Sequence, residues 1–325
     1  MGVDTVDGEL IHIARQMTHR LIDSRSSHTN TKYFSSFRKW KEWATEKNVE
    51  PLPANPIFVA LYITKLIEEK RSVSVVNSAV YAIKWAHELS GYESPTTHPF
   101  IKNLMESTKR SFGKPVQRKE PVTPEMLLSL CSKYKDTSDI TAIRDIAMIT
   151  LAFSAFLRYD ELSKLKCNQV HFYDEHVTLN IEFSKTDQYR KGNEIVLAKL
   201  PSVACPYVNL HRYISVCNID LHSDFYLFQP LVCTNNIVKC ISKNKPLSYT
   251  RARETLINRL KEVVNTDMNI GLHSLRSGGA TAAANANVSD RCFKLHGRWK
   301  SETAKDGYVD DSLESRLFVS QNLGL

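Results

Sequence analysis

Six side chains in the second half of the chain have types that could act together on a phosphodiester. They are Arg158, Lys185, His273, Arg276, Trp299 and Tyr308. The transition state of such a reaction spreads negative charge over the nonbridging oxygens, which two arginine forks can clamp bidentately where a lysine acts only as a point charge. A tyrosine can attack phosphorus once its phenol, which ordinarily titrates near pH ~10, has lost its proton. The set therefore predicts attack on a phosphodiester by Tyr308 between two arginines.

Three of these positions also have a structural explanation. Arg158 directly follows an apolar stretch, where the dipole at a helix C-terminus favours a cation. Lys185 lies just beyond an expected strand end, which is typical of a lysine on the surface of a hairpin. A single histidine is usually structural, but His273 and Arg276 are three residues apart and face the same point if that segment is helical. The six residues therefore indicate a function only when they are taken together.

The first third of the chain has helical periodicity. Residues 1–28 carry a short helical pattern that ends in a polar loop, and from Thr29 onward Phe37, Trp40 and Trp43 fall on one helix face. Prolines interrupt the pattern before further helices, which we expect over residues 58–69, 72–89 and 100–112. These segments predict a compact bundle of four or five helices.

Residues 108–121 differ in composition, being basic, polar and bounded by prolines, and they predict a linker. The linker is either a solvated tether or a strap that lies along DNA phosphates. Its basic residues, the candidate DNA contacts, are Lys109, Arg110, Lys114, Arg118 and Lys119.

The rest of the chain is predicted to be mostly helical with a small sheet. A proline after Thr123 opens a helix, and residues 142–157 are apolar enough for a buried core helix. The period then changes to two, which predicts a hairpin of strands 176–183 and 194–198 around the polar turn 184–193. Other helices are expected over 159–166, 204–216, 248–264, 274–287, 289–297 and 312–319. The predicted fold class is mainly α with a small β-sheet (α+β).

The order of the candidate residues resembles the tyrosine recombinase (phage integrase) superfamily. The segment Leu157-Arg158-x-x-Glu161-Leu162 is similar to the first arginine motif of that family, including the acidic residue three positions later. The segment His273-x-Leu275-Arg276 is similar to its second motif. Each motif is weak alone, but six positions in the correct order and spacing are a strong signal.

The remaining positions of the family set also have counterparts. Lys185 resembles the hairpin lysine, Trp299 the His-or-Trp position nine residues before the nucleophile, and Tyr308 the nucleophile itself. His296 lies twelve residues before the tyrosine and does not match. Residues 297–303 read Gly-Arg-Trp-Lys-Ser-Glu-Thr where bacterial members have Leu-Gly-His-x-x-x-x-Thr-Thr, which resembles eukaryotic mobile-element or yeast-plasmid members more closely.

The resemblance implies a domain organisation. Residues 29–107 would form a helical core-binding (SAM-like) DNA-binding domain behind an N-terminal extension (1–28), and after the linker (108–121) residues 122–325 would form the catalytic domain. The two domains of such enzymes clamp double-stranded DNA, which the family cuts and rejoins through a covalent 3′-phosphotyrosine. A homotetramer on DNA is implied, and the apolar residues of the C-terminal stretch could dock on a neighbouring copy.

Chemical roles follow for the other side chains. His273 is the candidate proton acceptor, or a hydrogen-bond donor to phosphate, and Lys185 can deliver a proton to the departing 5′-oxygen. Trp299 could donate its indole N–H to phosphate, and Glu161 is expected to orient Arg158 or His273. No metal and no ATP are expected, because arginines supply the positive charge and the phosphotyrosine conserves the bond energy. We also expect Gly307 to permit local movement of the tyrosine.

Composition limits the class of protein. The 325 residues are 42% hydrophobic and carry a net charge of +8, which makes a polyanionic partner plausible without proving one. No run of 18 apolar residues predicts a membrane span, no signal peptide is recognisable, and seven scattered cysteines fit reduced thiols in an intracellular protein. The expected location is nuclear in a eukaryote and otherwise cytoplasmic. The cysteine and histidine spacings match no zinc module.

Three other functions remain open from the sequence. The chain could be a DNA-binding protein that descends from a recombinase and no longer cuts DNA. A type IB topoisomerase fits the His-x-x-Arg motif and the helical first domain less well. A helical scaffold with no DNA role would leave the ordered set of residues unexplained.

Overall fold

The computed structural model describes residues 8–113, 117, 119–182, 192–234, 237–240, 244–264, 267–309 and 313–323. At 233–234, 237–240, 313–315 and 319 it describes the backbone only. The chain divides into two compact units, residues 1–116 and 117–325. No helix in the described ranges is long and apolar enough to cross a membrane.

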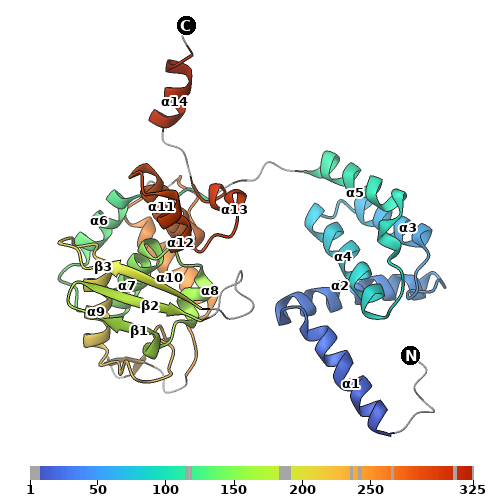
Figure 1. The fold of residues 1–325 in the computed structure, drawn as a ribbon, viewed down its shortest axis with the longest axis horizontal. Coiled ribbons are helices and arrows are strands. Elements are labelled where there is room, and N and C mark those ends of the chain that lie inside the picture. The colour runs from blue at the N-terminus through green and yellow to red at the C-terminus, as the bar shows by residue number, and fades with distance from the viewer. Residues whose placement is uncertain are drawn as a thin grey trace. The chain divides into compact units, whose positions relative to one another are not determined.

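The first unit is a helical bundle, as its periodicity predicts (Figure 1). Its elements are α1 (Gly8–Asp23), α2 (Ser27–Glu46), α3 (Pro56–Glu68), α4 (Val73–Leu89), the 3-10 turn η1 (Pro95–Thr97) and α5 (Pro99–Phe112). Helix α2 packs on α4 and α3 packs on α5 around a core that includes Trp40, Ile63 and Ile83. Helix α1 buries none of its residues in this core.

Proline and polar caps determine where these helices begin. Pro56 and Pro99 occupy first-turn positions, where the missing N–H costs nothing. The Asn55 side chain caps α3 by accepting a hydrogen bond from the backbone N–H of Ile57 at 2.9 Å. Pro56 and Pro99 therefore open helices in the structure, whereas Pro51 and Pro53 lie in the loop before α3.

A buried histidine, His87, connects α4 to the loop before α3. Its Nε2 accepts a hydrogen bond from the Ala54 N–H at 2.8 Å, so the ring proton lies on Nδ1, which donates to the Ile83 carbonyl at 2.7 Å. Burial lowers the pKa of His87, and the hydrogen bond to Ile83 opposes that shift in part. The neutral ring is thus the form that fits this site.

The second unit is mainly helical with a small sheet, which confirms the predicted fold class (Figure 1). Its helices are α6 (Pro124–Lys133), α7 (Ile140–Ser154), α8 (Tyr159–Lys164), α9 (Pro206–Val216), α10 (Tyr249–Lys261), α11 (His273–Asn285), α12 (Asp290–Gly297), α13 (Glu302–Asp306) and α14 (Leu313–Gln321), with the 3-10 turn η2 (Cys167–Gln169). Its strands are β1 (Val170–Phe172), β2 (His176–Ile181), β3 (Asn193–Ala198), β4 (Leu231–Thr234) and β5 (Ile237–Cys240).

The three-stranded sheet is antiparallel in the order β1-β2-β3. Leu179 of β2 is opposite Val170 on one side and Ile195 on the other, and all three are buried. The hairpin of β2 and β3 was predicted, whereas β1 and the separate β4-β5 pair were not. The turn between β2 and β3 lies mostly outside the described residues.

Helix α7 forms the centre of the second unit and packs against α6, α8, α9, α10 and α11. Its residues 142–152 are all buried. The helix ends at Ser154, earlier than the predicted residue 157, because Phe156 has a left-handed backbone with φ 48°. Arg158 therefore occupies the N-cap position of α8 and is not in the last turn of α7, so the helix-dipole explanation of this arginine is wrong.

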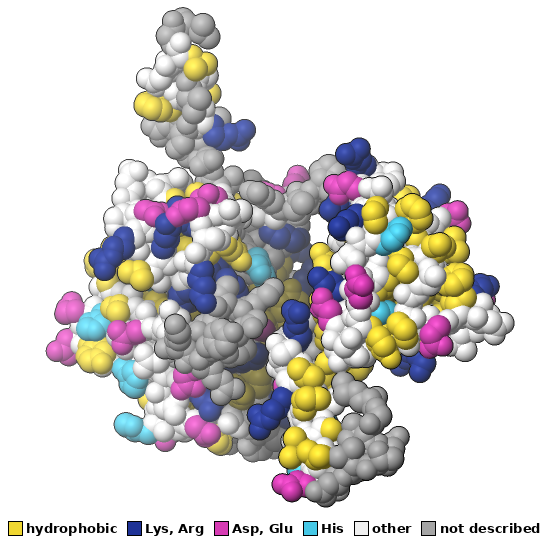
Figure 2. All heavy atoms as spheres, turned by 45° about the vertical axis from the view of Figure 1, so that its right-hand side comes forward, with side chains coloured by type: hydrophobic (Ala, Val, Ile, Leu, Met, Phe, Trp, Pro, Cys, Tyr) yellow, Lys and Arg dark blue, Asp and Glu magenta, His cyan; other side chains and the backbone are white. Residues whose placement is uncertain are grey.

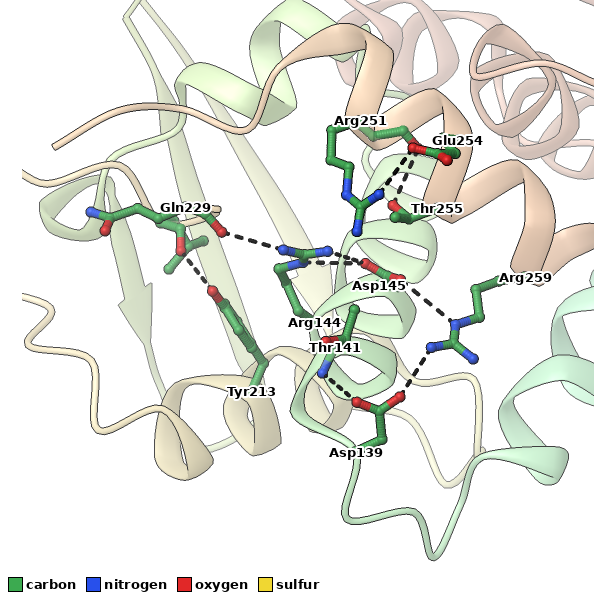
Figure 3. A network of polar contacts seen from close by, with 12 residues as sticks. Asp139, Thr141, Arg144, Asp145, Tyr213, Gln229, Arg251, Glu254, Thr255 and Arg259 are labelled. Atoms are coloured by element: carbon green, nitrogen blue, oxygen red, sulfur yellow. Dashed lines mark hydrogen bonds and ion pairs between the residues drawn. The ribbon is translucent and has the colours of Figure 1, made fainter. Parts of the chain in front are cut away.

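A buried ion-pair network fixes α7 to α10 (Figure 3). Arg144 donates to Asp145 at 2.8 Å and to the Gln229 carbonyl at 3.4 Å. Arg259 of α10 lies 3.6 Å from the second Asp145 oxygen and donates to Asp139 at 3.1 Å. Burial raises the pKa of Asp145, although both arginines act in the opposite direction.

The segment that enters the second unit bonds to the chain before α11 and to the first turn of that helix. The Glu120 N–H donates to the Asn269 carbonyl at 3.1 Å, and the Val122 N–H donates to the Ser274 carbonyl at 3.0 Å. A Cβ atom on Gly278 would lie 2.0 Å from the Val122 carbonyl oxygen, so only glycine permits this approach. The structure thus makes the end of the predicted linker part of the second unit, while residues 108–112 belong to α5.

Candidate active site

Arg276 is fully buried at the centre of the candidate site. Its guanidinium donates to the Phe156 carbonyl and, at 2.8 Å, to the Gly297 carbonyl. It also lies over two aromatic rings, 4.9 Å from the centre of Trp299 and 4.8 Å from that of Tyr308. Three predicted catalytic residues are thus in mutual contact, and burial, followed by the charge of Arg158, lowers the pKa of Arg276.

Small residues allow α11 to carry this arginine into the interior. A Cβ atom on Gly279 would lie 2.1 Å from the Phe153 carbonyl oxygen and 2.7 Å from the Phe156 ring. Helix α11 therefore packs directly on the end of α7. The run of glycine and alanine after Arg276 in the sequence is explained by this close packing.

Glu161 connects the arginines of the site. Its Oε1 accepts from the Arg158 guanidinium at 2.8 Å, and its Oε2 accepts from the Arg158 backbone N–H at 2.9 Å. The second contact is the half of a capping box that the N3 carboxylate makes at the start of α8, and Arg158, which has no side-chain acceptor, makes no return bond. Burial raises the pKa of Glu161, but Arg298 and Arg158 oppose it and the net shift is downward. The expected contact between Glu161 and Arg158 is present.

Arg298 is a member of this group that sequence reasoning missed. Its side chain is buried and donates to Glu161 Oε2 at 2.7 Å. Its backbone is left-handed, with φ 57° and ψ 37°, a conformation that costs a non-glycine residue about 1 kcal/mol or more. An arginine after Gly297 shows no pattern in one sequence, so no signal was available to find it.

Three buried N–H groups of the site have no hydrogen-bond partner: Arg276 Nε, Arg298 Nε and Trp299 Nε1. Within the described residues, they are the buried side-chain N–H groups without a partner. Three guanidinium groups also surround the single carboxylate of Glu161. Unpaired donors and excess positive charge are the features of a site that binds an anion.

The aromatic residues form a stack beside Arg276. Trp299 stacks on Phe293 with ring centres 4.9 Å apart, and the centre of the Tyr308 ring lies 5.8 Å from that of Trp299. A Cβ atom on Gly297 would fall 1.8 Å from the Trp299 ring, so glycine is required there. The stack therefore fixes the position of the tyrosine ring relative to the arginine.

Tyr308 also lines a pocket of about 130 Å³, together with Lys119, Glu120, Pro121, Ser277, Gly307 and Val309. The Lys119 ammonium contacts the Asn269 side chain. Gly307 has an ordinary right-handed φ of −61°, so its backbone conformation does not require glycine. The expectation that this glycine gives the tyrosine mobility gains no support from the backbone.

The other predicted residues are placed as follows. His273 is the exposed first residue of α11, one helical turn before Arg276. Lys185, Lys114 and Arg118 lie outside the described residues. His296 does not match the family spacing. Its Nε2 is hydrogen-bonded to the Ser154 carbonyl at 2.7 Å, and its ring centre lies 4.6 Å from that of Phe156. Its role is therefore structural.

Comparisons with known proteins identify the family. The model of the phage integrase family matches residues 121–313. An integrase/recombinase XerD homolog of Selenomonas ruminantium is 24% identical over 296 residues, which cover 90% of this chain and 84% of the relative. A tyrosine recombinase of Agathobacter rectalis is 29% identical over 155 residues, covering 46% of this chain and 42% of the relative.

Solved structures share the fold. The XerH site-specific recombinase bound to a palindromic difH substrate has a TM-score of 0.63 at 14% identity, covering 90% of this chain and 79% of that one. The Tn1549 transposon integrase in complex with transposon right end DNA has a TM-score of 0.57 at 14% identity, covering 96% and 98%. The fold is thus that of the tyrosine-type DNA strand transferases. The chain belongs to the phage integrase family, and it is a tyrosine recombinase.

Proposed function

We propose that the Arg276 site binds one phosphodiester of double-stranded DNA and that Tyr308 attacks it to form a 3′-phosphotyrosine. One observation carries the proposal: the fully buried Arg276 lies against the Tyr308 and Trp299 rings and keeps an Nε–H without a partner. A phosphate oxygen can accept from this N–H and from the indole N–H of Trp299. Arg158, held by Glu161, would be the second fork of the clamp.

The proposed cleavage step is a transesterification. The Tyr308 oxygen forms a bond to phosphorus while the bond from phosphorus to the 5′-oxygen breaks. The phenol proton passes to His273, and Lys185 supplies a proton to the departing 5′-oxygen. Rejoining is the reverse, with a 5′-hydroxyl attacking the phosphotyrosine. The arginines stabilise the charge of the transition state in both directions.

For binding, we propose that DNA phosphates contact the basic residues of the predicted linker in addition to the core-binding domain 29–107. On the face that Figure 2 draws, the lysine and arginine side chains are spread among acidic and apolar ones. Local basic segments are therefore better candidates than the net charge of +8. The residues are Lys109, Arg110, Lys114, Arg118 and Lys119, and their replacement with glutamine should flatten the salt dependence of binding by up to about 0.9 log units per lost contact.

We further propose that the protein assembles as a homotetramer on DNA inside the cell. Helix α14 leaves Leu317 and Phe318 exposed, and its apolar side chains could dock on a second copy. The lambda integrase forms a tetramer on a Holliday junction in a structure that shares this fold with a TM-score of 0.56. Similarity to eukaryotic mobile-element members rests on residues 297–303 alone, and the two curated relatives named above are bacterial.

A covalent-trapping experiment tests the function without knowledge of the target. A pool of nicked duplexes with randomised arms loses the short fragment after cleavage, so an adduct cannot religate and survives denaturation. We expect adducts with the wild-type chain, and peptide mapping should locate them at Tyr308. Tyr308→Phe removes one oxygen and keeps the ring, so it should bind DNA and form none. Adducts from this variant at the wild-type yield would exclude Tyr308 as the nucleophile, and DNA binding without adducts from the wild type would favour a protein that no longer cuts.

A further inference from the structure

Glu161 presents its two oxygens to three arginines on different elements, and the distances are unequal. Arg158 donates to Oε1 at 2.8 Å from the start of α8. At Oε2, Arg298 donates at 2.7 Å, whereas the nearest Arg276 nitrogen lies 3.9 Å away, beyond hydrogen-bonding distance. Arg298 therefore donates to the same carboxylate oxygen that lies nearest to Arg276.

The contacts of Arg298 keep its guanidinium in that place. One terminal nitrogen donates to the Ala155 carbonyl at 3.2 Å and to the His296 carbonyl at 2.9 Å. The other donates to the Phe156 carbonyl at 3.2 Å as well as to Glu161. This planar fork joins four acceptors across the end of α7 and the end of α12, which a lysine could reach only in part.

Its backbone conformation also indicates a function for the side chain. Arg298 ends α12 in a left-handed conformation that glycine adopts without strain. An arginine in this position costs free energy in two ways, because its backbone is strained and its charge is buried. The next residue is Trp299, whose ring covers Arg276. The strained position thus lies directly beside the phosphate clamp.

We propose that Arg298 is a positioning residue that pairs with Glu161 so that Arg276 stays available to the phosphate. Glu161 is needed to hold Arg158, but its charge would also attract Arg276 and neutralise it. Arg298 satisfies the second carboxylate oxygen, and Arg276 makes no hydrogen bond to Glu161, because its terminal nitrogens donate to the Phe156 and Gly297 carbonyls. The inference rests on the proposed function, because it assigns the phosphate to Arg276.

The test compares R298G, R298K, E161Q and the double variant E161Q/R298G in single-turnover adduct formation on a duplex trapped by the wild type. R298G suits the left-handed backbone, and it should slow adduct formation by about 10- to 100-fold, the order of effect that loss of a residue supporting a ligand has at metal sites. DNA affinity should stay close to that of the wild type. R298K, which keeps the charge but not the fork, should recover part of the rate.

The double variant separates positioning from a purely structural role. E161Q weakens the hold on Arg158 and should itself slow adduct formation. Its neutral amide no longer attracts Arg276, so the loss in E161Q/R298G should be smaller than the product of the two single losses. A structural role predicts that the two losses multiply, and a double variant that shows the full product would overturn the proposal. A wild-type rate in R298G would overturn it as well, while leaving the proposed function intact.

Thermal unfolding with inorganic phosphate gives a readout that does not require DNA cleavage. Phosphate bound at Arg276 should raise the melting temperature of the wild type in a concentration-dependent way, and the shift should be reduced in R298G. If the wild type forms no adduct but shows this difference, the proposed function fails and the positioning role stands. Equal phosphate shifts in both proteins would contradict the positioning role.

Discussion

The second unit contains two groups of arginines, each around a buried carboxylate, that differ in charge balance. The Glu161 group comprises Glu161, Arg158, Arg276 and Arg298, with three guanidinium groups around one carboxylate. The Asp145 group comprises Asp139, Arg144, Asp145 and Arg259 (Figure 3), with two guanidinium groups and two carboxylates. Both join elements distant in sequence, but only the second is neutral in total.

The buried atoms without a hydrogen-bond partner also differ between the two groups. In the Glu161 group they are donors, Arg276 Nε and Arg298 Nε, whereas in the Asp145 group the atom is an acceptor, Asp145 Oδ2, which lies 3.6 Å from Arg259. A balanced group is complete within the protein and stabilises the fold. The excess cations and unpaired donors of the Glu161 group fit the anion site proposed above.

The largest effect is expected from Arg276→Lys. The substitution keeps the charge but loses the fork that bonds two carbonyls and the phosphate, so adduct formation should fall about a thousandfold, as after loss of an electrostatic clamp. The matched control is Arg144→Lys in the Asp145 group, which should leave the rate of the folded protein unchanged. Single-turnover trapping measures both, and equal losses would remove the distinction between the groups.

The next effect concerns stability. Asp145→Asn leaves Arg144 buried without its carboxylate, which should lower the free energy of unfolding by about 3 kcal/mol. The exposed pair of Glu254 and Arg251 in Figure 3 provides a control, because Glu254→Gln should cost less than about 1 kcal/mol. Urea denaturation compares the two variants. If Asp145→Asn were as stable as Glu254→Gln, the Asp145 group would not hold the fold.

Glycine substitutions test whether close packing holds the Glu161 group together. Gly279→Ala places a Cβ atom 2.1 Å from the Phe153 carbonyl oxygen, so α11 must move, at a cost of about 2 kcal/mol and with slower adduct formation. Gly307→Ala meets nothing closer than 3.5 Å and should change stability by less than about 0.5 kcal/mol. Slow cleavage in Gly307→Ala, with unchanged stability, would instead support mobility of the tyrosine segment.

The smallest effect is expected from His87, a buried side chain that fits its site only when it is uncharged, and it concerns the pH dependence of stability. The folded-state pKa of His87 lies below its unfolded value, so the folded chain binds fewer protons. Its contribution to stability is complete above about pH 6.5 and is lost as the pH falls through the folded pKa. His87→Gln should reduce this acid sensitivity. Tryptophan fluorescence reports it, because Trp40, Trp43 and Trp85 all lie in the first unit.

Much of the fold could be predicted from periodicity, because long amphipathic helices and a two-residue alternation are local signals. The strands that were missed, β1 and the β4-β5 pair, have only three or four residues each. The end of α7 was misplaced because nothing in the sequence marks Phe156 as left-handed. A phenylalanine takes that conformation here because the packing around it, including α11, determines the turn.

For the site, residue type and order were enough to select Arg158, Arg276, Trp299 and Tyr308, which the structure brings together. The roles of His273 and Lys185 stay predictions. Arg298 could not be found, since its importance comes from a three-dimensional contact with Glu161, 137 positions away in the chain. Likewise, the composition of residues 108–121 could not indicate that its last residues bond to the segment before α11.

That bonding has a mechanical consequence. The Val122 N–H is tied to the Ser274 carbonyl, and Glu120 is tied to Asn269, so the incoming chain is anchored at the first turn of the helix that carries His273 and Arg276. Tension on the chain before Lys119 would be borne by these bonds before it reached the core. Force on the incoming chain would therefore act first on the start of α11. That point lies within one helical turn of Arg276, which contacts the Tyr308 ring.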